Sequence, residues 1–283
     1  MRRLLKKIGF LVCLLFFAGC AQTPETDGVL IKNARNEGIY IQTDGLKNAR
    51  NGKLAFIQHG LASNRNHPAV RVAKKAFLDN GYVVVSFDGR HSLGDGDDNV
   101  AKARLQTFEQ DLETVVDWAK KQSFYSEPFA LSGHSLGGAS VIRFAEKHND
   151  AVNVLIPVAP VVSGRSWEKS CMKNKPGFCR RWKQKGSYEH TDPNNRKTGV
   201  IPYAVVTSCM DYDAAASAKG FTAKTLLAAA ENDAVIVPAD VRELAEKMKN
   251  ARIATVKSSG HNFTRKNNQD DLYRAINAFL KGD

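Results

Sequence analysis

The sequence predicts an α/β fold with a mostly parallel sheet and helices on both of its faces. The first observation is that short β-rich runs alternate with longer segments of helical periodicity. The second is that several runs, such as VVVSF at 83–87 and NVLIPVA at 153–159, are almost entirely apolar, as in strands buried on both faces. This alternation favours a doubly wound sheet with right-handed crossovers. The 283 residues suffice for one domain of that class.

Each predicted element follows from its own residues. In the segment 102–122, apolar residues such as Leu105, Phe108 and Leu112 recur at helical spacing with charged residues between them. Pro238 suits the first turn of a helix, where its missing N–H group is not needed. Helices are expected at 68–80, 102–122, 136–148, 238–250 and 268–281. Strands are expected at 29–33, 39–43, 53–59, 82–88, 129–132, 152–159, 225–230 and 253–257.

The first 19 residues have the pattern of a secretory signal peptide. Four basic residues precede an apolar run at 8–17, which is shorter than the roughly 20 residues that cross a bilayer. The segment FAGC at 17–20 resembles a bacterial lipobox, which implies cleavage before Cys20 and lipidation of its thiol by acyl chains such as palmitate. An ordinary cleaved signal with a chance cysteine is the alternative. Ala21, in place of Asp, favours the outer membrane of a Gram-negative source.

These observations divide the chain into a signal peptide at 1–19, a lipidated tether at 20–27 and one domain at 28–283 in the cell envelope, outside the cytoplasm. Disulfides are permitted there. Cys171, Cys179 and Cys209 allow one bridge and one unpaired thiol. Cys171 and Cys179 are the candidate pair because they are close in sequence, although the sequence does not show that their geometry allows a bond.

A nucleophile motif occurs in the middle of the chain. The segment SGHSLGG at 132–138 follows a predicted strand and opens a predicted helix, which is the setting that G-x-S-x-G requires. The turn is tight, so the small residues Gly133 and Gly137 are needed on either side of Ser135. Two backbone N–H groups must stabilise the oxyanion of such a site. We expect them from Leu136, which follows the nucleophile, and from Leu61, which follows the strand at 53–59.

A serine nucleophile needs a base and an acid that orients the base. In this motif class the chain order is Ser, acid, His. Asp233 and His261 each follow a predicted strand near the carboxyl edge of the sheet, where α/β folds place their sites. Glu231, two residues from Asp233, is the nearest competitor for the acid, whereas Asp211 and Asp213 precede the strand.

Five segments together resemble the α/β-hydrolase superfamily across nearly all of residues 28–283. They are HGLASNRN (59–66), FDGRHSLGDGDDN (87–99), GHSLGG (133–138), ENDAVIVP (231–238) and SSGHNF (258–263). Their loops are most similar to those of the cinnamoyl/feruloyl esterase and serine-aminopeptidase-like branch. The resemblance implies an eight-stranded, mostly parallel α/β-hydrolase sheet and a cap insertion at about 161–224.

The predicted function is a serine hydrolase that cleaves carboxylic esters through an acyl-enzyme. A peptidase or a lipase on the same residues is an alternative, since fold does not define substrate. A non-catalytic envelope lipoprotein that uses the fold as a binding scaffold is another. No metal-ligand spacing and no phosphate-loop or dinucleotide motif occurs, so we expect neither a metal nor a cofactor.

The positive charge is concentrated in the cap. The chain carries a net charge of +12, of which +4 belongs to residues 1–19 and +7 to residues 163–199. That segment, which also holds four aromatic residues, lacks clear periodicity and is expected to be a long loop over the site. An anionic substrate group, a lipid surface or an acidic glycan would suit it, and a solvated lid without a partner is the alternative. Nucleic acid is not expected, because no recognition motif is present.

Overall fold

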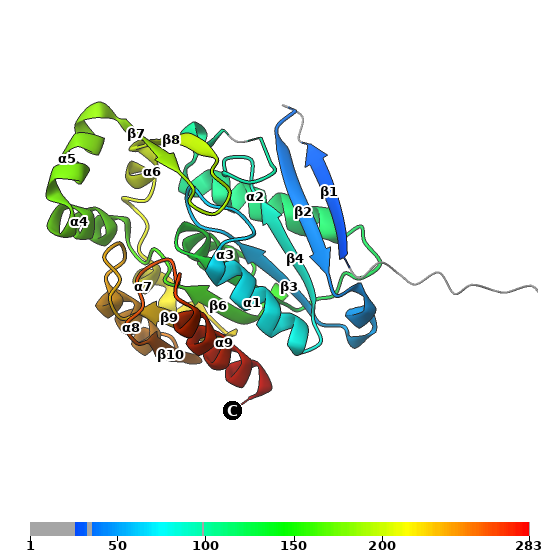
Figure 1. The fold of residues 1–283 in the computed structure, drawn as a ribbon. Helices are drawn as coiled ribbons and strands as arrows, with labels where there is room; N and C mark the ends of the chain where they lie inside the picture. The colour runs from blue at the N-terminus through cyan, green and yellow to red at the C-terminus, as the bar shows by residue number, and fades with distance from the viewer. Residues whose placement is uncertain (1–25, 33–35, 98, 283) are drawn as a thin grey trace, which may run out of the picture.

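The computed structural model describes residues 26–32, 36–97 and 99–282 (Figure 1). Their main sheet has eight strands in the order β1-β2-β4-β3-β5-β6-β9-β10. β2 pairs antiparallel with β1 and β4, and the remaining neighbours pair in parallel. The predicted mostly parallel sheet is therefore confirmed. Its strands are β1 (Thr26–Lys32), β2 (Gly38–Asp44), β3 (Leu54–Gln58), β4 (Val83–Asp88), β5 (Phe129–His134), β6 (Val152–Val158), β9 (Lys224–Ala230) and β10 (Ala251–Val256).

Two apolar layers cover the two faces of this sheet. Successive side chains of a strand point to opposite faces. Accordingly Leu54 and Phe56 of β3 join the core that contains α2 and α3, while Ala55 and Ile57 join the core beneath α1 and α9. Figure 1 shows α1 and α9 side by side on one face. The five predicted helices are α1 (Pro68–Asp79), α2 (Leu105–Ala119), α3 (Leu136–Lys147), α8 (Pro238–Lys247) and α9 (Lys266–Lys281).

The expectation of a long loop at 163–199 is wrong. This segment contains two helices and an antiparallel hairpin, which stand beyond one end of the sheet (Figure 1). Each helix buries only a narrow stripe at a spacing of three residues, with Trp167 and Ser170 in α4 and Cys179 and Trp182 in α5. Lysine, arginine and other polar residues occupy most of the remaining positions, so the apolar stripe is too narrow to give a clear helical period. The new elements are α4 (Gly164–Asn174), α5 (Pro176–Lys185), β7 (Ser187–Thr191), β8 (Thr198–Pro202), α6 (Ala204–Thr207) and α7 (Ala214–Ser217).

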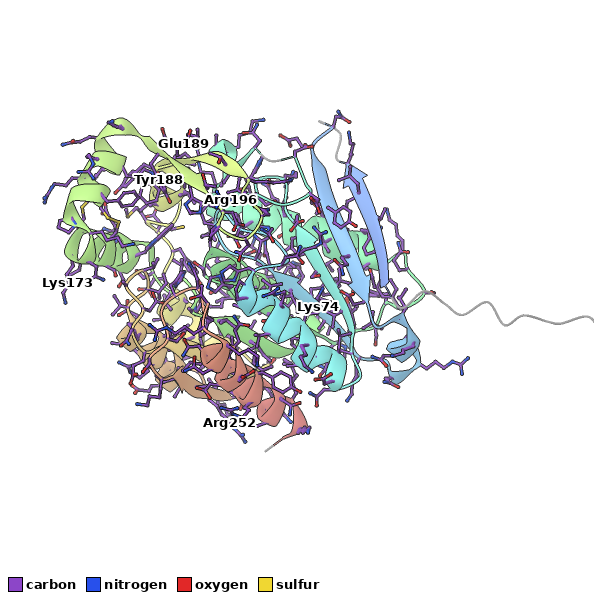
Figure 2. The ribbon with its side chains drawn as sticks, in the orientation of Figure 1. Lys74, Lys173, Tyr188, Glu189, Arg196 and Arg252 are labelled. Carbon is purple, nitrogen blue, oxygen red and sulfur yellow. A yellow bond between two sulfur atoms is a disulfide. The ribbon has the colours of Figure 1, made fainter. Side chains whose placement is uncertain are left out.

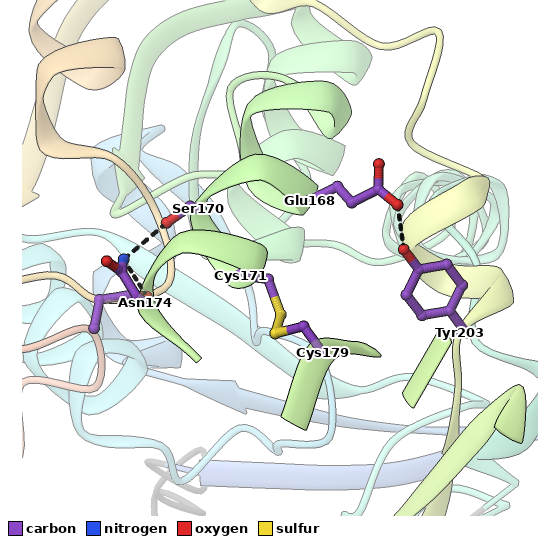
Figure 3. Close-up of a disulfide and its surroundings, with 7 residues drawn as sticks. Glu168, Ser170, Cys171, Asn174, Cys179 and Tyr203 are labelled. Carbon is purple, nitrogen blue, oxygen red and sulfur yellow. Dashed lines mark hydrogen bonds between the residues drawn. A yellow bond between two sulfur atoms is a disulfide. The ribbon is translucent and has the colours of Figure 1, made fainter. Parts of the chain in front are cut away.

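A disulfide joins the two cap helices. The structure links Cys171 of α4 to Cys179 of α5, with the two Cα atoms 5.9 Å apart (Figure 3). Tyr203 also donates a hydrogen bond to Glu168 of α4, so the helix is tied to the segment before α6 (Figure 3). Cys209 is a buried free thiol. The expected pairing is therefore present in the structure, and the cap is a cross-linked unit.

The N-terminal predictions concern residues that the structure does not describe. The signal peptide at 1–19, Cys20 and the tether up to residue 25 all lie outside the described residues. Within the described part of the chain, no helix combines the length and the apolar character needed to cross a membrane.

Candidate active site

Ser135 occupies a strained turn between β5 and α3. Its φ of 55° and ψ of −117° lie in a region that residues other than glycine rarely adopt. A Cβ at Gly133 would lie 2.3 Å from the carbonyl oxygen of Gly137, and a Cβ at Gly137 would lie 2.2 Å from that of His59. Both glycines are therefore required by contact, because a side chain at either position would collide with the backbone. The turn places Ser135, which is 8% exposed, at the carboxyl edge of the sheet.

The structure brings Asp233 and His261 to this serine. Nε2 of His261 lies 2.9 Å from Oγ of Ser135, and Nδ1 lies 2.8 Å from Oδ2 of Asp233. The sheet register explains the meeting, because Ala230 at the end of β9 pairs with Val256 at the end of β10. The loops that follow these two strands consequently begin side by side.

Asp233 is held as an acceptor for the imidazole. Its Oδ1 accepts hydrogen bonds from the backbone N–H groups of Val235 at 2.8 Å and Ile236 at 2.9 Å, which leaves Oδ2 for His261. The side chain of Asp233 is 2% exposed and that of His261 is 12% exposed. Because a carboxylate only accepts, the Nδ1 of His261 carries the proton and its Nε2 presents a lone pair to Ser135. This is the arrangement of a general base next to a nucleophile.

The competing acids lie elsewhere. Glu231 accepts hydrogen bonds from the backbone N–H of Ser258 at 2.8 Å and from Lys257 at 3.0 Å. Asp213 caps α7 by accepting from Ala215 at 3.0 Å, and Asp211 is fully exposed. None of the three is hydrogen-bonded to His261, so the structure selects Asp233 as the acid that contacts it.

Backbone donors surround the same point. Leu136 is the first residue of α3, and the N–H groups of a first helical turn have no partner within the helix. Gln58 of β3 pairs with Gly133 of β5, so the loop containing Leu61 begins beside the nucleophile turn. A Cβ at Gly60 would lie 3.1 Å from the Cβ of Ser135, which shows how closely this loop approaches. Both predicted oxyanion donors thus belong to segments that border Ser135.

Two buried histidines, His134 and His67, pack behind His261. No local sequence signal predicts this packing. Nε2 of His134 donates to the carbonyl oxygen of His261 at 3.0 Å, since that oxygen can only accept. The ring of His67 stacks on that of His134 with centroids 4.4 Å apart. Burial lowers the pKa of His134 well below its ordinary value and that of His67 to about 3, and the charge on protonated His261 adds to both effects. Both rings are therefore neutral near pH 7.

Two pockets open from Ser135. The first, of about 330 Å³ and here called the aromatic pocket, lies under the cap and is lined chiefly by Trp167, Cys171, Phe178, Trp182, Tyr188 and Val235. The second, of about 230 Å³ and here called the polar pocket, is lined chiefly by Ser63, His67, His134, Asp192, Asn194 and Asn262. Five residues border both pockets, namely Leu61, Ser135, Tyr188, His190 and His261. A larger cavity of about 360 Å³ lies at the amino ends of β5 and β6, away from the nucleophile.

The aromatic pocket has rigid walls. Tyr188 contacts Phe178 and Trp182 edge to face, with ring centroids 4.8 and 5.0 Å apart. The indole N–H of Trp182 donates to the carbonyl oxygen of Ile201 at 3.1 Å, and Cys171 brings the disulfide into the wall. Figure 2 shows Tyr188 on the inner side of the cap, whereas Lys173 points outward.

Among the described residues, no group of three or more His, Cys, Asp and Glu side chains could hold a metal ion.

Comparison with known proteins places this chain in a family. The family described as serine aminopeptidase, S33 matches residues 51–267. Among curated proteins, the uncharacterised YDL057W of Saccharomyces cerevisiae is 27% identical over 176 residues, or 57% of this chain. The match spans about half of that yeast protein, 52% of its length.

Solved structures share the fold at low sequence identity. The ferulic acid-bound Est1E of Butyrivibrio proteoclasticus has a TM-score of 0.71 at 18% identity, covering 90% of this chain and 98% of that one. The esterase Pf2001 of Pyrococcus furiosus has a TM-score of 0.66 at 17% identity, covering 91% and 92%. These likenesses confirm the predicted α/β-hydrolase fold.

Proposed function

Because the chain belongs to the serine aminopeptidase S33 family of α/β-hydrolases, we propose that it cleaves carboxylic esters with Ser135 as the nucleophile. The observation that carries the proposal is the continuous hydrogen-bonded chain from Ser135 through His261 to Asp233. A serine hydroxyl is a weak nucleophile, and this arrangement supplies the base and the carboxylate that orients it.

The reaction has two steps. In the first, Oγ of Ser135 attacks the ester carbonyl while Nε2 of His261 takes the hydroxyl proton, and the alcohol leaves with that proton. In the second, His261 takes a proton from water, which attacks the acyl-enzyme, and the acid departs as Ser135 regains its proton. Asp233 stabilises the imidazolium in both steps. The N–H groups of Leu136 and Leu61 stabilise the negative charge on the carbonyl oxygen.

The substrate's acyl group would lie in the aromatic pocket. Its volume of about 330 Å³ and its ring-lined walls suit a compact aromatic or branched apolar group. The bound acid of Est1E, ferulic acid, is such a group, and that neighbour therefore agrees with the proposal. A long alkyl chain would have to leave the pocket past the cap, so we expect short and aromatic esters to be preferred.

The nucleophile is tested with one variant. Ser135→Ala should abolish hydrolysis of p-nitrophenyl benzoate and prevent labelling by a fluorophosphonate probe, while far-ultraviolet circular dichroism stays unchanged. Turnover that survives in the folded variant would remove Ser135 from the mechanism. A folded wild-type protein that neither labels nor turns over would instead favour the scaffold role.

The family description supports a second candidate, a peptidase on the same residues. An ester and an anilide of the same acid distinguish the two, because both use the same acyl pocket. If kcat/KM for the ester is only slightly higher than kcat/KM for the anilide, the result would favour the peptidase. The ester proposal expects the anilide to be hydrolysed at least about 10³-fold more slowly, since its leaving group is the poorer one.

We also propose that the mature protein is a lipoprotein of the cell envelope. The support is the basic and apolar start of the chain followed by FAGC at 17–20. Mass spectrometry of the mature N-terminus should find acylated Cys20, and Cys20→Ser should release the protein from membranes. A mature chain that keeps an unmodified Cys20 would exclude this anchor.

The cap has an outward cationic face that would favour anionic substrates. Here the cap face means six exposed cations that form no ion pair within the described residues. They are Lys169, Lys173, Lys175, Arg180, Arg181 and Lys185. Lys183 differs from them, because it pairs with Glu168 at 2.8 Å. Of the six, Lys175 also lines the aromatic pocket, so the cationic face reaches the entrance to the site.

A further inference from the structure

The disulfide of the cap borders the aromatic pocket, and the proposed mechanism gives it no role. Cys171 of α4 is half-buried and lines this pocket, whereas Cys179 of α5 is fully buried. Trp167 lies one turn before Cys171, and Phe178 and Trp182 lie on either side of Cys179 in the sequence. All three aromatic residues line the pocket. The disulfide therefore joins the two sets of aromatic residues that the helices contribute to the pocket.

Helix α4 is fastened to the side of the site that carries the catalytic acid. Nδ2 of Asn174, at the end of the helix, donates to the carbonyl oxygen of Ala234 at 3.1 Å (Figure 3). Ala234 directly follows Asp233. In the first turns of the same helix, the hydroxyl of Ser166 donates to Asp240 of α8. The position of α4 is thus tied to the loop and the helix that follow β9.

Helix α5 is fastened to the opposite side, the hairpin of β7 and β8. The indole N–H of Trp182 donates to Ile201 of β8, and the rings of Phe178 and Trp182 pack edge to face against Tyr188 of β7. The two helices are therefore attached to different parts of the molecule, and the width of the pocket between them depends on what joins α4 to α5.

The noncovalent links between α4 and α5 lie away from the pocket. Glu168 of α4 pairs with Lys183 of α5 at 2.8 Å, but the side chain of Lys183 is 55% exposed, and exposed ion pairs contribute little. Tyr203 donates to Glu168, and its ring lies 5.2 Å from that of Trp182. Neither Glu168, Lys183 nor Tyr203 lines the aromatic pocket, whereas Cys171 does. The disulfide is thus the link that sets the spacing of the helices at the pocket wall.

We propose that this disulfide determines the selectivity of the aromatic pocket for its acyl group, and that reduction by a dithiol relaxes the selectivity without abolishing hydrolysis. The inference rests on the proposed ester hydrolysis at Ser135. With the bond intact, the walls are preorganised and an aromatic acyl group binds at little cost in ordering. With the bond broken, each helix keeps its own attachments but their spacing is no longer fixed. An acetyl group is too small to depend on that spacing.

The reduction is an ordinary thiol–disulfide exchange. A thiolate of the dithiol attacks Sγ of Cys171, which is approached from the pocket, and the bond to Cys179 breaks. Cys179 leaves as a thiolate and takes up a proton. The second thiol of the reductant then displaces Cys171 from the mixed disulfide. The dithiol is oxidised to its disulfide by two electrons, and its two protons end on the two cysteines.

Two esters with one leaving group test the selectivity. p-Nitrophenyl benzoate and p-nitrophenyl acetate differ only in the acyl group. Treatment of the wild type with dithiothreitol should lower kcat/KM for the benzoate about tenfold, as expected when one or two side chains must be ordered on binding. It should change kcat/KM for the acetate less than about twofold. Alkylation followed by peptide mapping should find both Cys171 and Cys179 as free thiols in the treated protein.

Two variants serve as controls. Cys171→Ser combined with Cys179→Ser should show the relaxed selectivity without reductant and should not respond to dithiothreitol. Cys209 is a buried free thiol that lines neither pocket beside Ser135, so Cys209→Ala should respond to dithiothreitol as the wild type does. Far-ultraviolet circular dichroism and fluorophosphonate labelling of Ser135 should be the same before and after reduction.

The outcomes distinguish this inference from the proposed function. If the folded protein releases no thiols, if reduction leaves the ratio of the two esters unchanged, or if both esters slow equally, the disulfide does not determine selectivity, although ester hydrolysis stands. If the oxidised wild type hydrolyses neither ester and its Ser135 does not label, the proposed function fails, and this inference fails with it.

Discussion

The buried histidine His67 predicts how the stability of the fold depends on pH. His67 is 5% exposed, and its Nδ1 accepts a hydrogen bond from the backbone N–H of Ala69 at the start of α1, at 3.2 Å. Burial, together with the neighbouring His261, lowers its pKa from 6.5 to about 3. The native state therefore keeps this ring neutral, whereas the unfolded chain binds a proton at about pH 6.5.

The sign and the size of the effect follow from this difference. Above pH 6.5 both states are neutral at this position and stability is unaffected. As the pH falls below 6.5, only the unfolded state takes up the proton, so the free energy of unfolding falls until the pH reaches the native pKa of about 3. At pH 5 the loss attributable to His67 is about 2 kcal/mol, from 1.5 pH units at about 1.4 kcal/mol each.

Replacement by asparagine isolates this contribution. Asparagine is a good helix N-cap, so His67→Asn keeps an acceptor for Ala69 while removing the titration. We expect the variant to lose about 2 kcal/mol less than the wild type between pH 7.5 and pH 5. Urea unfolding at constant ionic strength, followed by circular dichroism at both pH values, measures the difference. His59 and His134 have lowered pKa values too, so the variant should still be destabilised by acid.

Similar free energies at pH 7.5 would show that the helix cap survives the substitution. Equal losses in the wild type and the variant on going to pH 5 would contradict a lowered native pKa for His67, because that residue would then bind its proton equally in both states.

Three further predictions concern the site and the cap. Asp233→Asn should lower kcat/KM for a benzoate ester roughly 10³- to 10⁴-fold, because the amide can favour the wrong tautomer of His261, whereas Glu231→Gln should change it less than about twofold. Gly137→Ala should destabilise the fold by about 3 kcal/mol in urea unfolding, since its Cβ would lie 2.2 Å from a backbone oxygen; an unaltered midpoint would contradict the geometry of the turn. Arg180→Glu combined with Arg181→Glu should lower kcat/KM for an anionic ester about tenfold at low ionic strength and leave kcat/KM for a neutral ester unchanged. The difference between the two esters should vanish in 1 M salt. Equal effects on both esters would exclude a role for the cap face.

The sheet and the nucleophile could be predicted because their causes are local. A strand buried on both faces is largely apolar, as at 83–85 in β4, and the turn at Ser135 requires glycine at two fixed positions. Asp233 and His261 could be placed because each follows its own strand. The sequence favoured Asp233 and left Glu231 as its nearest competitor, and the structure has Asp233 on His261 and Glu231 on Ser258.

The cap insertion was expected, but its helices and hairpin and the two pockets could not be predicted, because they depend on contacts between distant residues. Asn64 and Asp192, which close the polar pocket, are 128 residues apart in the chain. The stacking of His67 on His134 likewise joins the start of α1 to the end of β5. In α4 and α5, at most about one residue per turn is buried, and the disulfide between Cys171 and Cys179 joins the two helices. So sparse a pattern has no visible period in the sequence.

The same separation of local and distant causes bears on the charge of the cap. Most of the residues that make the segment 163–199 basic lie on α4 and α5, while its aromatic residues line the pocket. The polar pocket, in contrast, contains the carboxylate of Asp192. A negative group on a ligand would therefore be favoured at the rim, near Lys175, and disfavoured in the polar pocket. Net charge therefore bears on where a ligand approaches, and we expect the side chains that line the two pockets to decide which group fits beside Ser135.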